Sequence, residues 1–230
     1  ALDVPTQDAA LALVRTLGDQ CRFYKIGLEL FAAEGPRVVR AVRDAGADVF
    51  LDLKFHDIPN TVRGAVRSAA ALGVRLMTVH AAGGVAMLQA AQDGAAGTGC
   101  ELLGVTVLTS LDAPSLAAAW GRDRVDVRVE VLRLAGLAAE AGLHGVVCSG
   151  HEAAEVRLAY GGRLATLVPG VRLAGDGAQD QARVVTPRAA ALAGARYVIL
   201  GRTVTAAADP KAAMVRVAED LAGAVSGRPD

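Results

Sequence analysis

The sequence alternates short β-type runs with alanine-rich segments of helical spacing along its whole length. The runs are rich in Val, Ile and Leu, as expected of strands that are buried on both faces. We predict eight strands, at Ala1–Val4, Phe23–Glu29, Asp48–Phe55, Leu76–Ala81, Leu102–Thr109, Gly145–Ser149, Ala165–Val171 and Tyr197–Gly201. Eight strand–helix units in 230 residues predict an α/β fold of the (β/α)8 or TIM-barrel type, which typically takes about 250 residues.

The segments between these runs carry the marks of eight helical segments. Thr186 and Asp209 each precede a proline, and a capping side chain before a proline in the first helical turn is a common helix start. The composition does not shift along the chain, so we expect a single domain over residues 1–230. The rival fold is a doubly wound sheet, but the Gly-x-Gly-x-x-Gly turn typical of it is missing after the first strand. The long irregular stretches are residues 111–126 and 172–183.

Charge and composition exclude several classes of function. Lys and Arg total 24 and Asp and Glu total 24, so the basic surplus of a general nucleic-acid or anionic-membrane binder is absent. No apolar stretch approaches the roughly 20 residues of a membrane helix, and no signal-peptide pattern opens the sequence. The three cysteines have no C-x-x-C spacing, so we expect free thiols and a reducing, cytoplasmic location.

The third predicted strand places opposite charges where a barrel interior is expected. Because side chains alternate between the two faces of a strand, Asp52 and Lys54 share the inward face. Lys25 on the second strand also faces inward, beside Asp52, and Asp57 lies in the loop just after the third strand. Charges in such a place are costly unless they are paired. Two interpretations are open: a structural ion pair, or a reactive lysine held by carboxylates at the end of the barrel where active sites lie.

The last two strands end in residues suited to an anion. Gly201 and Arg202 follow the eighth strand, where barrels often bind phosphate through backbone N–H groups. Pro169, Gly170 and Arg172 close the seventh strand, and the loop from there to Gln181 is either a lid over a ligand or a plain solvated loop.

The run Asp52-Leu53-Lys54-Phe55-His56-Asp57-Ile58-Pro59-Asn60-Thr61 resembles the sequence signature of the orotidine 5'-phosphate decarboxylase family. Its Asp-x-Lys-x-x-Asp part is shared with a wider group of sugar-phosphate barrels, and the continuation is more specific. The resemblance covers nearly the whole chain. It also rests on Ala1–Pro5, Lys25–Gly27, Val79–Ala81, Val107–Ser110, Pro169–Arg172, Gln181 and Gly201–Arg202.

This resemblance implies loss of CO2 from orotidine 5'-phosphate to give UMP, a step of pyrimidine biosynthesis, by a homodimer without metal or organic cofactor. Lys54 would be the proton donor, and Lys25, Asp52 and Asp57 would complete a charged tetrad. Asp57 and Thr61 would cross to the site of the partner subunit. The implied substrate-binding residues are Asp3, Lys25, Asp52, Thr61, Thr109, Ser110, Pro169, Arg172, Gln181, Gly201 and Arg202.

The sequence departs from the family pattern at Val168, where the family has threonine, and over Leu173–Asp180. Neither departure touches the tetrad, so both bear on the lid alone. Two other functions stay open: a magnesium-dependent keto-sugar-phosphate decarboxylase or aldolase of the same barrel group, and a non-catalytic phosphate-binding barrel. We expect His56, between Lys54 and Asp57, and His80, at the end of the fourth predicted strand, to be structural.

Overall fold

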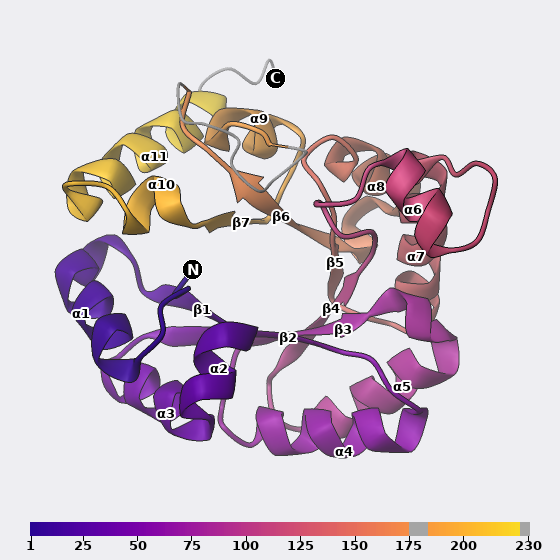
Figure 1. Cartoon of the computed structure of the whole chain (residues 1–230), viewed down its shortest axis with the longest axis horizontal. Helices are drawn as coiled ribbons and strands as arrows, with labels where there is room; N and C mark the ends of the chain where they lie inside the picture. The colour runs from indigo at the N-terminus through magenta and orange to yellow at the C-terminus, as the bar shows by residue number, and fades with distance from the viewer. Residues whose placement is uncertain (175–183, 226–230) are drawn as a thin grey trace.

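The computed structural model describes residues 1–174 and 184–225, and within these ranges seven parallel strands pair in sequence order from β1 to β7. Figure 1 shows the strands curving around a centre, with the helices outside them. The predicted barrel class is therefore confirmed. The strands are β1 (Phe23–Gly27), β2 (Asp48–Phe55), β3 (Leu76–His80), β4 (Glu101–Val105), β5 (Gly145–Val147), β6 (Ala165–Val171) and β7 (Tyr197–Leu200).

The helices occupy the segments between the strands. They are α1 (Gln7–Leu17), α2 (Leu28–Glu34), α3 (Pro36–Asp44), α4 (Pro59–Ala70), α5 (Gly84–Ala95), α6 (Ala113–Ala119), α7 (Val127–Glu140), α8 (Ala153–Tyr160), α9 (Pro187–Leu192), α10 (Arg202–Thr205) and α11 (Pro210–Val225). Within the described ranges this exceeds the eight predicted helical segments, because short helices such as α2, α6 and α10 form in what were expected to be strand ends or loops. The predicted caps are present: Thr186 accepts from the N–H of Ala189, and Asp209 from that of Ala212. No helix in the described part of the chain is long and apolar enough to cross a membrane.

The prediction of a first strand at Ala1–Val4 was wrong. This segment runs between β7 and β1, with the N–H of Leu2 donating to Lys25 O (2.9 Å) and the amino group of Ala1 donating to Leu200 O (2.7 Å). It is not a strand, because these contacts do not continue into a ladder: the Asp3 side chain turns to Lys25, and Pro5 has no N–H to donate. Five predicted strands also extend beyond the observed ends, which lie at Gly27, His80, Val105, Val147 and Leu200. The first of these, β1, stops at Gly27 because α2 begins at Leu28.

The barrel is filled rather than hollow. Its interior cluster consists of buried Phe50, Leu76, Leu103 and Leu167, with Phe23, Val147, Tyr197 and Ile199 packed against them. The alternate residues of the same strands, such as Tyr24, Ile26, Val49 and Leu51, pack against the helices in the larger outer core. The period-2 alternation thus separates the two cores, and polar side chains on the inward face come together above the interior cluster.

Candidate active site

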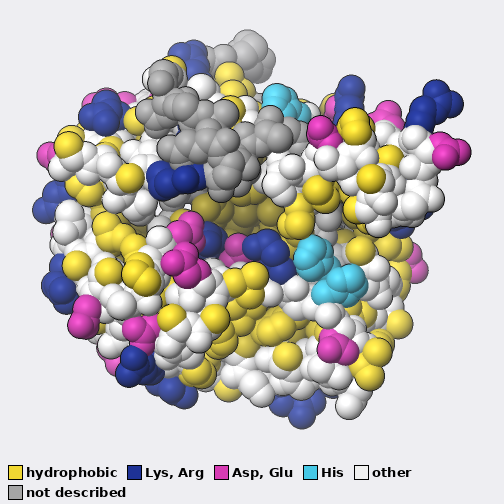
Figure 2. Space-filling model, viewed as in Figure 1, with side chains coloured by type: hydrophobic (Ala, Val, Ile, Leu, Met, Phe, Trp, Pro, Cys, Tyr) yellow, Lys and Arg dark blue, Asp and Glu magenta, His cyan; other side chains and the backbone are white. Residues whose placement is uncertain are grey.

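A cavity of about 560 Å³ opens at the carboxyl ends of the strands. In Figure 2 the centre of this face is hollowed, and basic and acidic side chains meet there beside hydrophobic ones. The floor is apolar because inward-facing Phe50, Val147, Leu167 and Ile199 of the barrel interior line it. Ten residues predicted for the site also line it: Asp3, Lys25, Asp52, Lys54, Thr109, Ser110, Pro169, Arg172, Gly201 and Arg202.

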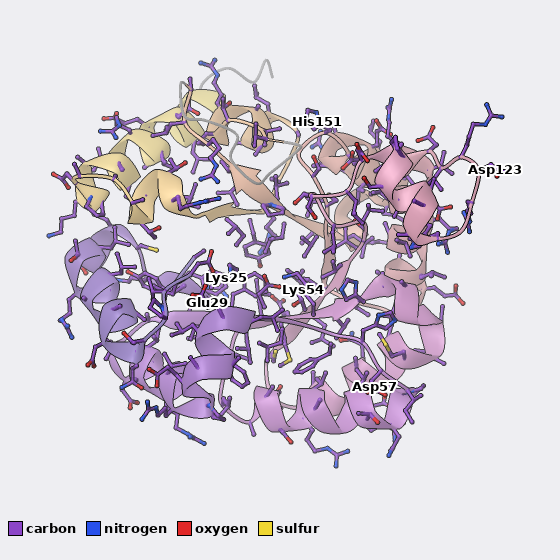
Figure 3. The ribbon with its side chains drawn as sticks, in the orientation of Figure 1. Lys25, Glu29, Lys54, Asp57, Asp123 and His151 are labelled. Atoms are coloured by element: carbon purple, nitrogen blue, oxygen red, sulfur yellow. The ribbon has the colours of Figure 1, made fainter. Side chains whose placement is uncertain are left out.

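Four charged side chains form an alternating array on one wall of the cavity. Lys54 Nζ lies 2.8 Å from Asp52 Oδ2, and Lys25 Nζ lies 4.0 Å from the same oxygen. Lys25 Nζ also lies 2.9 Å from Asp3 Oδ1. Figure 3 shows Lys25 and Lys54 directed towards the centre of the barrel. The Asp52 and Lys25 side chains are 14% and 12% exposed, so their attraction is less screened than that of surface ion pairs.

Thr78 on β3 completes the hydrogen bonding of Asp52. Its hydroxyl donates to Asp52 Oδ1 over 2.9 Å and accepts the backbone N–H of Lys54, also over 2.9 Å. Both oxygens of the Asp52 carboxylate therefore have partners. A carboxylate held in this way keeps one position, so the ammonium of Lys54 has a fixed anchor.

Lys54 lies in a bulge at the end of β2. Between Leu51 and Phe55 the chain advances four residues, while β3 advances two, from Met77 to Val79. Lys54 has φ of 51° and is the sole described non-glycine residue with positive φ. This left-handed conformation costs a side-chain-bearing residue about 1–3 kcal/mol and persists where the surroundings fix it. Here the hydrogen bond to Thr78 and the ion pair with Asp52 fix it, and the bulge directs Lys54 into the cavity.

Asp3 is the second carboxylate of the array within this chain. Burial tends to raise the pKa of Asp3, but the charge of Lys25 and the hydrogen bond from it outweigh burial and hold that pKa below its usual value. Asp3 is thus kept ionised. Gly27 makes room for the pair, because a Cβ on Gly27 would lie 2.8 Å from Lys25 Nζ.

The far side of the cavity carries two arginines. Arg172 is 8% exposed, and its Nη1 lies 3.5 Å from Thr203 Oγ1. Its backbone N–H donates to Val185 O. Arg202 begins α10, directly after Gly201. Two guanidinium groups at one end of a cavity suit the binding of a phosphate or another anion.

Two residues predicted for the site lie elsewhere, and a third falls outside the described residues. Asp57 and Thr61 are exposed and do not line the cavity, and Asp57 Oδ1 accepts the N–H of Ile58. In Figure 3 Asp57 lies beside α4, away from Lys54. This chain's cavity therefore does not contain the fourth tetrad member, and the prediction that both residues serve a partner subunit stays a prediction. Gln181 lies outside the described residues, as does most of the segment expected to form the lid.

Sequence reasoning missed Thr78, Glu29 and the role of Asp3 in the ion array. Thr78 is fully buried and shares the inward face of β3 with Leu76. A polar residue at an inward position of a buried strand was the signal that could have identified it. Glu29 lines the cavity from α2 (Figure 3), a helix whose first two residues had been predicted as the end of a strand.

The two histidines at the mouth contact each other. The rings of His56 and His80 are 5.3 Å apart between centroids and tilted by 34°. Burial lowers the pKa of His80, and the neighbouring His56 and Lys54 lower it further. Across residues 1–174 and 184–225, no group of three His, Cys, Asp or Glu side chains is arranged to hold a metal ion.

Taken together, the fold and the cavity define a (β/α)-barrel protein with an ionic site at the end of the barrel where barrel enzymes carry out catalysis. The chain matches the family model described as "Orotidine 5'-phosphate decarboxylase / HUMPS family" over residues 1–217. It belongs to this family.

Individual relatives agree with this assignment. The chain is 53% identical over 221 residues to the orotidine 5'-phosphate decarboxylase of Anaeromyxobacter sp. (strain K), with 96% of each chain covered. It is 47% identical over 228 residues to that of Moorella thermoacetica, which covers 96% of this chain and 90% of the relative. The crystal structure of orotidine 5'-phosphate decarboxylase from Lactobacillus acidophilus superposes with a TM-score of 0.84 at 35% identity, covering 96% of each chain.

Proposed function

We propose that this protein is a carboxy-lyase that converts orotidine 5'-phosphate to UMP and CO2 in pyrimidine biosynthesis. The observation that carries the proposal is the array of Asp3, Lys25, Asp52 and Lys54 in one cavity, with Arg172 and Arg202 at its other end. The array provides charge for the reacting carbon, and the arginines provide a binding site for the phosphate. Residues 1–230 are taken as one catalytic domain.

Lys54 is proposed as the proton donor. The bond between the pyrimidine ring and its carboxylate breaks, the electron pair stays on the ring carbon, and the Lys54 ammonium gives that carbon a proton as CO2 leaves. A fixed ammonium stabilises the negative charge that develops on the carbon, which is the main electrostatic contribution in such a reaction. No metal or organic cofactor enters this mechanism.

Asp52, which also pairs with Lys25, is proposed to hold Lys54 in position. Asp52 pairs with both ammonium groups, and each charge in the array has a neighbour of opposite sign, which offsets part of the cost of placing these charges in the cavity. Asp52 is also proposed to lie beside the substrate carboxylate, where its charge would disfavour the bound carboxylate relative to the transition state. Asp3 and Lys25 are proposed to bind the ribose hydroxyls, and Thr109 and Ser110 to contact the base.

The phosphate is proposed to bind at Pro169, Arg172, Gln181, Gly201 and Arg202. Binding energy from this remote group would be used to place the pyrimidine against Lys54 and to close the loop that follows β6. The cytoplasm is the expected compartment, because Cys21, Cys100 and Cys148 are thiols and not members of disulfides, the form that a reducing compartment maintains.

The test follows pyrimidine absorbance after orotidine 5'-phosphate is added. We expect turnover by the unmodified protein, retained turnover in EDTA, and loss of turnover in Lys54→Ala. Lys211→Ala, in exposed residue Lys211 at the start of α11, is the matched control and should behave as the unmodified protein. Absence of turnover, or an absolute need for a divalent metal, would reject the proposal in favour of another activity of the barrel group.

We further propose a homodimer in which Asp57 and Thr61 reach the partner's site. Lys54→Ala and Asp57→Ala should each be inactive alone. If Asp57 acts across the interface, a refolded equimolar mixture regains about a quarter of the activity, because half of the dimers are mixed and each has one intact site. A mixture that stays inactive would show that Asp57 acts within its own subunit, or not at all.

A further inference from the structure

A second cavity lies at the end of the barrel opposite the proposed active site. It has a volume of about 710 Å³ and is bordered by residues that precede or begin β5, β6 and β7. Since the strands are parallel, these amino ends all lie on the face remote from the mouth. The interior cluster that includes Leu103, Leu167 and Tyr197 lies between the two cavities, so the second one is separate from the array around Lys54.

Three arginines line this cavity. Arg157 comes from α8, Arg163 from the 3-10 turn Gly161–Arg163, and Arg196 from the residue before β7. Within residues 1–174 and 184–225, no carboxylate lies within ion-pair distance of these three guanidinium groups, although ten other basic side chains form such pairs with carboxylates, nine arginine or lysine and one histidine. His144 adds an imidazole at the rim, and its Nδ1 is paired with Glu101 at 3.0 Å.

Local contacts orient the arginines. Arg163 donates through Nε to Tyr160 O, and Arg196 donates through Nε to the Tyr197 hydroxyl, each over 3.4 Å. Both guanidinium groups also lie over the ring of their tyrosine, at 5.9 and 5.8 Å from the centroid. These contacts use the inner nitrogen of each group, and within residues 1–174 and 184–225 no hydrogen bond to a protein group uses the two terminal nitrogens of either.

Glycines give the arginines and a ligand their space. A Cβ on Gly194 would lie 2.5 Å from Arg157 Cδ, so the Arg157 side chain runs directly over this residue. A Cβ on Gly162 would meet no atom within 4 Å, so the turn leaves open space on that side. Leu158, which is 81% exposed, adds an apolar surface to the lining.

We propose that this cavity binds an oligophosphate, carried by a nucleotide or free in solution. Three guanidinium groups without carboxylate partners match several phosphate groups better than a single carboxylate, and each can donate two parallel hydrogen bonds. The concave form favours a small ligand. A nucleic acid is disfavoured, because the chain has no basic surplus to follow an extended backbone. Leu158 provides a surface for the apolar part of a nucleotide.

The test is isothermal titration with tripolyphosphate and, separately, with ATP. Both titrations use an Arg202→Ala background, which removes the proposed phosphate contact at the mouth, and ATP carries a purine rather than the pyrimidine of the proposed substrate. We expect one saturable site per chain. Arg157→Gln, Arg163→Gln and Arg196→Gln should each weaken binding about tenfold. Arg216→Gln, on the exposed side of α11, is the matched control and should leave it unchanged.

The outcomes separate the alternatives. Equal affinity for tripolyphosphate and ATP supports an oligophosphate site, and tighter binding of ATP supports a nucleotide, with that gain lost in Leu158→Ser. Absence of saturable binding, or binding that the three glutamine variants do not weaken, overturns the proposal. Equal binding of a hexaglutamate peptide also overturns it, because that result describes a general anionic surface. None of these readouts uses turnover, so the binding results test this proposal independently of the proposed decarboxylase activity.

Discussion

The Gly27→Ala substitution probes how closely the ion array is packed. Gly27 is the last residue of β1, pairs with Asp52 across the sheet, and has a negative φ that alanine accepts readily. An added Cβ would lie 2.8 Å from Lys25 Nζ and 3.5 Å from Asp3 Oδ1. The atom in conflict is the tip of a flexible side chain, so the fold can tolerate the change while the ammonium must move.

The size of the movement follows from the contact distance. Ordinary van der Waals contact begins at 3.4 Å, so the ammonium must retreat by the difference from 2.8 Å, about 0.6 Å. A displacement of this order among reacting groups costs about ten- to a hundredfold in rate, given that roughly 1 Å can cost 10²-fold. Lys25 would lose its 2.9 Å contact with Asp3 or its approach to Asp52 at 4.0 Å.

The assay is kcat/KM for orotidine 5'-phosphate, with the thermal midpoint of each variant measured alongside. We expect Gly27→Ala to lower kcat/KM about ten- to a hundredfold with little change in the midpoint. Gly64→Ala, in the middle of α4 with no atom within 4 Å of the added Cβ, is the control and should keep full activity. Unchanged kcat/KM in Gly27→Ala would refute the claim that the position of the Lys25 ammonium matters for catalysis.

Three further predictions concern binding, pH and packing. Arg202→Ala should raise KM for orotidine 5'-phosphate at least tenfold, since it removes a guanidinium from the proposed phosphate end, while circular dichroism shows an intact fold; an unchanged KM would contradict this role. Burial and neighbouring His56 lower the pKa of His80, so the unfolded state takes up the proton first. The contribution of neutral His80 to the free energy of unfolding should therefore be fully present above pH 6.5, the ordinary pKa of histidine, and should decrease as the pH falls below that value. Melting curves should show that acid lowers the melting temperature less in His80→Gln than in the unmodified protein. An equal decrease in both proteins would exclude His80 as the source. Gly145→Ala should lower the free energy of unfolding by about 1–3 kcal/mol, because the new Cβ would lie 2.1 Å from Ala165 O; denaturant titration with an unchanged midpoint would refute this.

The inward charges were predictable because they depend on a local rule. Alternation along β2 and β1 placed Asp52 and Lys25 on the inward face from sequence alone. It predicted the same face for Lys54, but in the structure the bulge between Leu51 and Phe55 directs Lys54 into the cavity. The same rule separated the interior residues, such as Phe50, from the residues that pack on the helices. Membership of the family was also predictable, because its motif is contiguous from Asp52 to Thr61.

The details of the array were not predictable, because they depend on pairing between distant segments. The bulge that gives Lys54 its positive φ arises from the register between β2 and β3, and Thr78 fixes it from 24 residues away. Asp3 reaches Lys25 only because the first residues of the chain lie against β1. No spacing in the sequence encodes these contacts.

What the sequence by itself determined is the order of the seven strands found in the described residues, the barrel class, and the inward face of Lys25 and Asp52, since each follows from periodicity within one segment. What only the tertiary structure decided is the partner of each charge: Asp3 rather than Asp57 beside Lys25 and Lys54 within one chain, and three arginines gathered at the opposite end. The physical reason is that a side chain's direction is a property of its own strand, whereas its neighbours depend on how segments far apart in the chain pack together.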